Sequence, residues 1–374
     1  MSTTVEDRAY RKIINSWCMY DWANSAFATT IMAAMFPPFY RSLATTAGLS
    51  GANATAAWAY TTSIALFLIA VLAPVLGAIS DHTGGKKWYV AFFAGMGVLG
   101  TGLFVILGDD TYVLASILYI IGNMGFAGAN IFYESLLPHI AKKGDIDQIS
   151  TRGYALGYVG GGILLIINVL WFMKPELFFM PGTGIALRAA FFSVAVWWAL
   201  FSIPLFRNVP EPAVVRIQGE RVNVLQAGFG RLAHTFGQIR QYKQLLIFLV
   251  AFWIYNDGIG TIIKMATAYG DEIGIGLTDM TIALIITQFV GIPFSFGFGW
   301  LAQRLGTKRS ILLGLGVYVC ISIAGYFMQT ATHFYILAFM VGTVQGGSQA
   351  LSRSLYGTMV PKSQSAEFFG FFST

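Results

Sequence analysis

Long apolar stretches, each close to 20 residues, recur along the chain between short polar segments. A helix of about 20 residues crosses the hydrocarbon core of a bilayer and satisfies its own backbone hydrogen bonds there. The 374-residue chain is only 11% charged, whereas soluble domains carry about 25% charged residues. The sequence therefore predicts an all-α membrane protein. Its ten complete spans are expected at residues 14–40, 56–80, 88–107, 112–137, 153–173, 185–206, 244–268, 278–302, 310–329 and 333–359.

One loop between two apolar stretches occurs twice. Gly77–Lys87 reads GAISDHTGGKK, and Gly299–Arg309 reads GWLAQRLGTKR. A second echo keeps nearly the same offset, since YESLLP at Tyr133–Pro138 returns as YGTMVP at Tyr356–Pro361. Two echoes at one spacing indicate two copies of a structural unit, as in many secondary transporters. The residues that correspond to Gly77, Asp81, Gly84, Lys86 and Lys87 are Gly299, Gln303, Gly306, Lys308 and Arg309.

The repeat predicts two helical bundles and a linker. An N-terminal six-helix bundle is expected over residues 1–206, a cytoplasmic linker over 207–243 and an incomplete C-terminal bundle over 244–374. The sequence after Pro361 mirrors the entry to the span at 153–173, so an eleventh span is expected to begin there. We therefore expect a truncated version of a twelve-helix architecture.

The linker contains a stripe of apolar residues at helical spacing, formed by Leu225, Phe229, Leu232, Phe236 and Ile239. One apolar stripe among polar residues predicts an amphipathic helix. We expect it to lie flat on the inner membrane face. The alternative is an ordinary helix packed against the bundle.

The positive charges are distributed asymmetrically. Of 23 Lys and Arg residues, 18 fall in segments expected on one side, three on the other and two inside spans. Positive charges concentrate in cytoplasmic loops, so the N-terminus is expected in the cytoplasm. The net charge of +6 reflects this topology, and no nucleic-acid partner is predicted.

The first copy of the loop has the composition of a tight turn at the membrane surface. Gly77 and Gly84 permit close approach and positive φ, and Lys86 and Lys87 suit the headgroup region. Asp81 follows its apolar stretch directly, where it can accept backbone N–H groups or pair with a cation. Glu134 is expected to join Asp81 and a loop cation in a gating contact. The alternative is a contact with the substrate.

Asp21 opens a polar stripe in the first span. Asn24 and Ser25 follow it at i+3 and i+4, so all three share one helix face. Charged residues inside spans are costly and usually functional. We expect Asp21 to face a cavity. The alternative is a carboxylate at headgroup level, near Arg11 and Lys12, that caps the helix.

Asp257 lies near the middle of the seventh span, which is the repeat partner of the first. Gly258 and Gly260 loosen the helix beside Asn256 and Asp257 and free backbone carbonyls for a ligand. Lys264 lies two turns further on the same face. Three roles stay open for Lys264: balancing Asp257, binding a carboxylate, or reaching the membrane surface.

Arg353 is expected inside the tenth span. It follows Gln349 and Gln345 at spacings of four, which makes a polar stripe. A buried guanidinium suits bidentate binding of a carboxylate. Asn130 and Asn123, two turns apart in the fourth span, form the comparable stripe of the first half.

The fifth span opens with the glycine-rich sequence GYALGYVGGG, in which Gly157, Gly160, Gly161 and Gly162 favour close helix packing. It resembles the glycine-rich span-five motif that is associated with antiporters in the major facilitator superfamily. Here Tyr158 occupies the position that is usually proline. No metal-ligand spacing, nucleophile–base pair or phosphate-binding glycine loop stands out in the sequence, so no enzyme, metal or cofactor is predicted.

The loop pattern G-x3-D-x2-G-x-K-K resembles the signature of the major facilitator superfamily, and Gln303 departs from it in the second copy. YDWANSAF in span one and YNDGIGTI in span seven are similar to the autophagy-related vacuolar amino-acid effluxer branch, which has bacterial members. The resemblance implies a major facilitator-type two-bundle fold of twelve helices. It also implies export of neutral amino acids such as leucine, as in the fungal members.

These observations predict a secondary active transporter with alternating access. A zwitterionic amino acid would satisfy acidic Asp21 and Asp257 together with basic Lys264 and Arg353, and protons are possible coupling ions. Two rivals are a multidrug-type efflux carrier, suggested by the high aromatic content, and a non-transporting membrane scaffold or sensor. The short loops favour the plasma membrane of a bacterium, with lipids as the surrounding partners.

Overall fold

The computed structural model describes residues 5–213 and 242–373, without the side chains of 264–269, 271, 272 and 277. The described residues form helices joined by short turns, with no strand among them. The amphipathic helix predicted within 207–243 falls mostly outside the described residues. The principal helices are α1 (Val5–Ala26), α2 (Phe36–Thr46), α3 (Gly51–Thr83), α4 (Lys86–Gly102), α5 (Tyr112–Ser135), α6 (Leu137–Ile140), α7 (Ile146–Met173), α8 (Thr183–Asn208), α10 (Lys243–Glu272), α11 (Leu277–Leu305), α12 (Thr307–Tyr326), α13 (Ala331–Met359) and α14 (Ser365–Phe372).

Helical structure occupies each of the ten predicted spans. Several helices run beyond the predicted ends, since α1 begins at Val5 and α7 at Ile146. Hydropathy marks only the apolar part of a helix, and polar turns continue the same backbone geometry on either side.

Eight of the described helices are long and apolar enough to cross a membrane: Gly51–Thr83, Lys86–Ile106, Tyr112–Ile140, Ile146–Met173, Thr183–Asn208, Lys243–Ile263, Thr278–Leu305 and Thr307–Tyr326. The predicted first and tenth spans carry polar side chains, Asp21 and Arg353 among them, and fall outside this set. The count of ten spans with an eleventh beginning therefore stays a prediction.

The first predicted span is irregular. Its middle, Phe27–Met35, is π-helical, and α2 then begins with Phe36-Pro37-Pro38. Proline lacks a backbone N–H, so these residues cannot donate to the preceding turn, and a widened turn accommodates the break. The ring of Phe36 is fully buried and lies 4.3 Å from Phe104 and 5.4 Å from Tyr119 between centroids. These contacts anchor the irregular segment among the helices of the first half.

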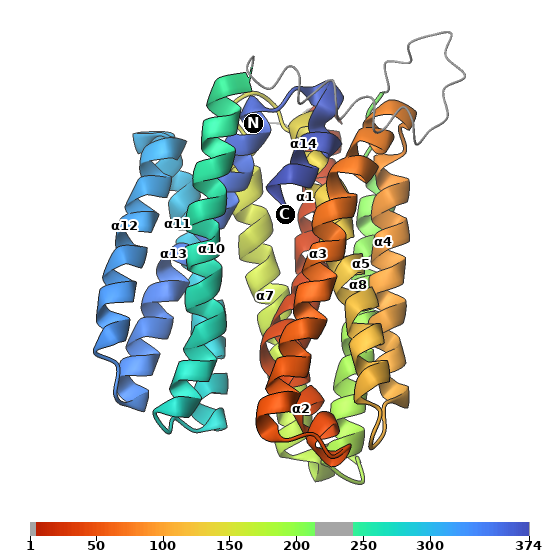
Figure 1. Cartoon of the computed structure of the whole chain (residues 1–374). Coiled ribbons are helices and arrows are strands. Elements are labelled where there is room, and N and C mark those ends of the chain that lie inside the picture. The colour runs from red at the N-terminus through yellow and green to blue at the C-terminus, as the bar shows by residue number, and fades with distance from the viewer. Residues whose placement is uncertain (1–4, 214–241, 374) are drawn as a thin grey trace.

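The helices stand in two groups with nearly parallel axes (Figure 1). Helices α1 to α8 form the first group and α10 to α13 form the second. Helix α14 follows α13 in the chain and is counted here with the second group, although it packs against α3 of the first. The end with the turns at 84–85, 141–145 and 306 is called the proximal end here. The opposite, distal end carries the turns at 47–50, 107–111 and 327–330 (Figure 1).

Candidate functional site

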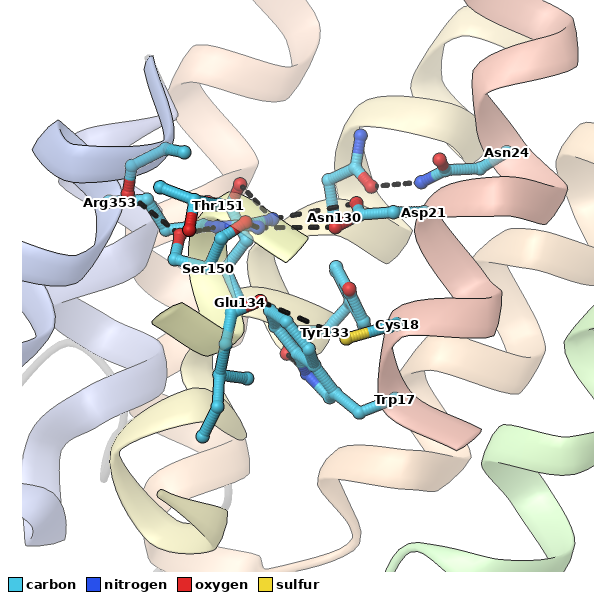
Figure 2. A network of polar contacts seen from close by, with 12 residues as sticks. Trp17, Cys18, Asp21, Asn24, Asn130, Tyr133, Glu134, Ser150, Thr151 and Arg353 are labelled. Carbon is cyan, nitrogen blue, oxygen red and sulfur yellow. Dashed lines mark hydrogen bonds and ion pairs between the residues drawn. The ribbon is translucent and has the colours of Figure 1, made fainter. Parts of the chain in front are cut away.

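A cluster of charged side chains joins the two helix groups near the proximal end (Figure 2). Arg353 of α13 donates from Nη2 to Oδ2 of Asp21 on α1 at 3.1 Å and from Nη1 to Oδ1 at 3.4 Å. Its Nη1 also lies 3.8 Å from Oε1 of Glu134 on α5. The guanidinium further donates to Ser150 of α7, at 2.8 Å to the hydroxyl and 2.9 Å to the carbonyl. One arginine of the second group is thus bound by three helices of the first.

The cluster is buried. The Arg353 side chain is 1% exposed, and the side chains of Asp21 and Glu134 are each 13% exposed. Removing charges from water is costly unless they are paired and hydrogen-bonded. The bidentate contact with Asp21 and the bonds to Ser150 meet that requirement for the guanidinium.

Aromatic rings surround the guanidinium. Its central carbon lies 4.5 Å from the ring centroid of Tyr154 and 4.9 Å from that of Trp17, within cation–π range. Trp17 stacks on Tyr133 with centroids 4.4 Å apart and donates from Nε1 to the Tyr133 carbonyl at 3.1 Å (Figure 2). These rings fix the position of Arg353 and exclude water from it.

The glycines of α7 make room for α1. A Cβ at Gly153 would lie 2.2 Å from Oδ2 of Asp21, and one at Gly157 would lie 2.5 Å from Oγ of Ser25. Gly160 and Gly161 likewise meet the backbone or side chains of α1, whereas Gly162 faces α11. The packing role predicted for this glycine-rich segment is confirmed. Side chains at Gly153 or Gly157 would displace the residues that form the cluster.

The polar stripe of α1 continues toward the distal end. Asn24 donates from its amide nitrogen to Oδ1 of Asn130 on α5 at 2.6 Å (Figure 2). Ser25 is half-buried between α1 and α7. Asp21 and Asn24 therefore lie close together on α1, which agrees with the predicted common helix face, and Asn130 of α5 lies beside them.

The first copy of the repeated loop connects the two groups at the proximal surface. Asp81 forms an ion pair with Lys86 and accepts the backbone N–H groups of Ala366 and Glu367 at 3.2 and 2.8 Å. Carboxylates at a helix N-terminus satisfy its free N–H groups and match its dipole. Both predicted alternatives for Asp81, pairing with a cation and binding backbone N–H groups, are confirmed together.

Lys87 and its neighbours tie α4 to the end of α8. Lys87 donates from Nζ to the carbonyls of Phe206 and Val209 at 2.8 and 2.6 Å, a favourable place for a cation because helix C-termini are negative. Glu211 accepts the backbone N–H groups of Lys86 and Lys87. The sequence predicted none of these contacts, and the placement of Lys87 at headgroup depth stays a prediction.

The expected partnership of Glu134 with Asp81 is wrong. Glu134 lies beside Arg353 in the charge cluster (Figure 2), while Asp81 binds Lys86 and the start of α14. The sequence echo placed Glu134 correctly near the proximal end of its helix. It carried no information on which side of α5 the carboxylate faces.

The second copy of the loop makes a different contact. Gln303 is exposed, and the acid at this place comes instead from Asp147 near the start of α7. Its carboxylate accepts the hydroxyl of Thr307 at 2.7 Å and that of Ser354. In the first copy the acid lies beside the loop and binds the start of α14, whereas in the second copy the acid lies at the start of α7 and binds Thr307 beside the loop.

Asp257 and its neighbours lie apart from the charge cluster. Asp257 is exposed on α10, one turn beyond Trp253, whose indole donates to the Phe371 carbonyl at 3.0 Å. The side of α10 that meets α13 carries Tyr255 instead, whose hydroxyl is hydrogen-bonded to the hydroxyl of Ser352 with an O–O distance of 2.5 Å. Asn256 and Gln349 are half-buried, and the side chain of Lys264 lies outside the described residues.

Some residues of the site were missed by the sequence reasoning. They are Trp17, Asp147, Ser150, Gly153 and Tyr154. Asp147, Ser150 and Tyr154 recur every three or four residues along the helix that carries the glycine motif, and that periodicity was an available signal. Within the described residues, no group of three or more His, Cys, Asp or Glu side chains is arranged to hold a metal ion.

Solved structures of membrane transporters share this arrangement. The proton:xylose symporter XylE superposes with a TM-score of 0.63 and 13% identity, over 98% of this chain and 84% of that one. A bacterial homologue of the iron transporter ferroportin, in an outward-facing state, gives a TM-score of 0.63 at 13% identity, over 97% of this chain and 87% of that one. The chain therefore has the same fold as these solved transporters.

The sequence comparisons narrow this class to one family. Residues 9–146 and 142–374 match the family model described as "Vacuole effluxer Atg22 like". A Bacillus subtilis (strain 168) protein described as an uncharacterized MFS-type transporter, YxiO, is 39% identical over 98% of this chain and 85% of its own length. Autophagy-related protein 22 of Coccidioides immitis is 22% identical, and the alignment spans 84% of this chain but 64% of that protein. The chain belongs to the Atg22-like family of major facilitator transporters.

Proposed function

We propose that this protein is a secondary active transporter that moves amino acids across a membrane by alternating access, with protons as the coupling ion. The observation that carries the proposal is the ion pair between Asp21 and Arg353, which belong to different helix groups. An amino acid carries the same two charges in one molecule. Its ammonium group would take the place of Arg353 beside Asp21, and its carboxylate would take the place of Asp21 beside Arg353.

The location of the contacts supports a rocking motion. In the described part of the chain, every hydrogen bond and ion pair between the two groups joins residues toward the proximal end, as at Asp21, Asp81 and Asp147. A molecule closed at one end in this way matches one of the two states that alternating access requires. Opening the proximal end requires the Asp21–Arg353 pair to separate.

We assign the proximal end to the cytoplasm. Lys86 and Lys87 lie in the first turn of α4, and Lys308 and Arg309 lie in the first turn of α12, all at this end, in keeping with the concentration of positive charge on the cytoplasmic side. The short turns between the helices favour the plasma membrane of a bacterial cell. Asn24, Ser25 and Asn130 extend the site from Asp21 toward the distal opening, while Asn256, Asp257, Lys264 and Gln349 are proposed to meet the solute on the side of the second group.

Flux measurements in proteoliposomes test the function. The protein should take up radiolabelled neutral amino acids when a pH gradient is imposed, and Asp21→Asn and Arg353→Gln should each abolish uptake. Arg309→Gln, an exposed change at the proximal surface, is the matched control and should leave uptake intact. Absence of uptake of any amino acid by the wild-type protein would remove the substrate assignment.

One observation favours the multidrug alternative. A lateral cavity of about 430 Å³ lies between α7 and α8 and is lined almost entirely by apolar groups, including Trp171, Phe192 and Trp197. Such a surface suits an amphipathic organic molecule. Dye efflux from the same proteoliposomes, together with no response to amino acids, would establish this alternative.

A further inference from the structure

The charge cluster holds more carboxyl groups than cations. Asp21 and Glu134 both approach Arg353, and among the described residues no other Lys or Arg lies within ion-pair distance of either carboxyl group. With both carboxyl groups ionised, the cluster would carry one unpaired negative charge. An unpaired charge away from water is so costly that the group takes up a proton instead.

The geometry distinguishes the two carboxyl groups. The carboxylate of Asp21 accepts a hydrogen bond from each terminal nitrogen of the guanidinium, with N–O distances of 3.1 and 3.4 Å. Glu134 has only one contact with the same guanidinium, at 3.8 Å, beyond normal hydrogen-bond length. The bidentate partner keeps its negative charge, since charge-assisted paired bonds favour the ionised form. The proton therefore belongs on Glu134.

The other ionisable groups around the cluster do not change this balance of two carboxyl groups against one cation. They are Cys18 and Tyr20 of α1, Tyr133 of α5 and Tyr154 of α7, and free thiols and phenols are neutral near pH 7. Asp147 is one turn away from Ser150 and is engaged by two hydroxyls. Arg152 on the same helix is exposed and lines a separate surface cavity with Asp145.

We propose that Glu134 is the proton-binding residue of the transport cycle, protonated while the proximal end is closed and ionised once that end opens. Opening moves Arg353 away with the second helix group and admits water to Asp21 and Glu134, which both belong to the first. Hydration stabilises the carboxylate, so the proton leaves Glu134 for the solvent on the proximal side. This inference rests on the proposed proton-coupled transport and names the residue that binds the coupling proton.

A measurement without any substrate tests the assignment. Spin labels at Lys143→Cys and Lys308→Cys, exposed positions on the two groups at the proximal surface, report the separation of the groups in a background of Cys18→Ala and Cys320→Ala. In the otherwise wild-type protein, we expect the population of the longer distance to rise with pH. Glu134→Gln mimics the protonated form, so the short distance should persist at every pH.

Asp145→Asn is the matched control, because Asp145 is a half-buried carboxylate at the same end that binds Tyr10 and not Arg353. It should keep the pH response of the parent. A second readout is the infrared carbonyl band of a protonated carboxyl group, which should weaken in Glu134→Gln relative to the parent at neutral pH.

Two results would overturn the assignment. One is a pH response of Glu134→Gln equal to that of the parent, and the other is an unchanged carbonyl band in that variant. Neither depends on flux, so a failure of the amino-acid proposal in proteoliposomes would be recognised separately.

Discussion

The two copies of the repeated loop keep their glycines but not their acid. A Cβ at Gly77 would lie 2.3 Å from the Ala366 carbonyl oxygen, and one at Gly299 would lie 2.5 Å from the Thr151 hydroxyl. Each glycine therefore lets its helix touch the other group. Gly84 and Gly306 both have positive φ, of 79° and 85°, which glycine adopts without strain.

The acid differs because the carboxylate at the second copy comes from the other helix group. Asp81 binds the first N–H groups of α14, whereas exposed Gln303 makes no such contact in the described part of the chain and Asp147 supplies the carboxylate from the opposite group. The same contrast separates Asp21, which is buried against Arg353, from Asp257 in the similar motif of the seventh predicted span, which is exposed. The positions of the glycines therefore follow the repeat, whereas the positions of the charged residues depend on the individual contacts between the two helix groups.

Removal of Arg353, the cation that Asp21 and Glu134 share, should have the largest effect on stability. Arg353→Leu leaves two carboxyl groups in a buried site without a counter-charge. Breaking a buried pair from one side costs about 3–5 kcal/mol. We expect a marked fall of the thermal unfolding temperature in detergent, while Arg309→Leu, on the exposed second loop, stays close to wild type. Equal stability of the two variants would contradict the buried cluster.

Adding a methyl group to each repeated glycine compares the two close approaches. At Gly77 the obstacle is a backbone carbonyl, whereas at Gly299 it is a side-chain hydroxyl that can rotate. Overpacking costs about 1–3 kcal/mol, so Gly77→Ala should lose more stability than Gly299→Ala. Gly316→Ala, with open space around it, is the control for the helix-propensity change. The reverse order in thermal unfolding would refute the contacts described at α14.

Removing the polar group from each copy compares the two loops directly. Asp81→Ala loses the contact with Lys86 and leaves two N–H groups of α14 without their acceptor. Loss of a capping side chain costs about 0.5–2 kcal/mol. Gln303→Ala should change stability by less than about 0.5 kcal/mol, as exposed substitutions do. Comparable losses in chemical unfolding would mean that the second loop also carries a capping contact.

The smallest effect is expected at Asp257. Because this side chain is exposed, Asp257→Asn should alter the unfolding free energy by less than about 0.5 kcal/mol. Asp21→Asn weakens a buried ion pair and should be clearly destabilising by the same measurement. A large loss in Asp257→Asn would place that carboxylate in a buried contact.

The sequence predicted features that depend on a single helix or on the repeat. Apolar periodicity located the helices, and the echo of GAISDHTGGKK identified the glycines that approach the other group. Arg353 was recognised as a buried cation, because a charge in an apolar stretch requires partners. Those partners were not predicted, since Asp21 and Arg353 are 332 positions apart and no local pattern relates two helices of different groups.

Depth along a helix was easier to predict than direction around it. Glu134 was placed correctly near the proximal end but assigned to Asp81 instead of Arg353. Asp257 was predicted to contribute to the solute site in the same way as Asp21, because the two motifs look alike. The orientation of α10, which turns Tyr255 toward α13, depends on packing between helices that the sequence alone does not reveal.

The account depends on one mechanical claim, that the cluster around Arg353 keeps the proximal end closed. The distance between spin labels at positions 143 and 308 measures this directly in wild-type and Arg353→Gln protein. The account predicts that Arg353→Gln shifts the distribution to longer distances, because the bond between the helix groups is lost. An unchanged distribution would contradict the claim.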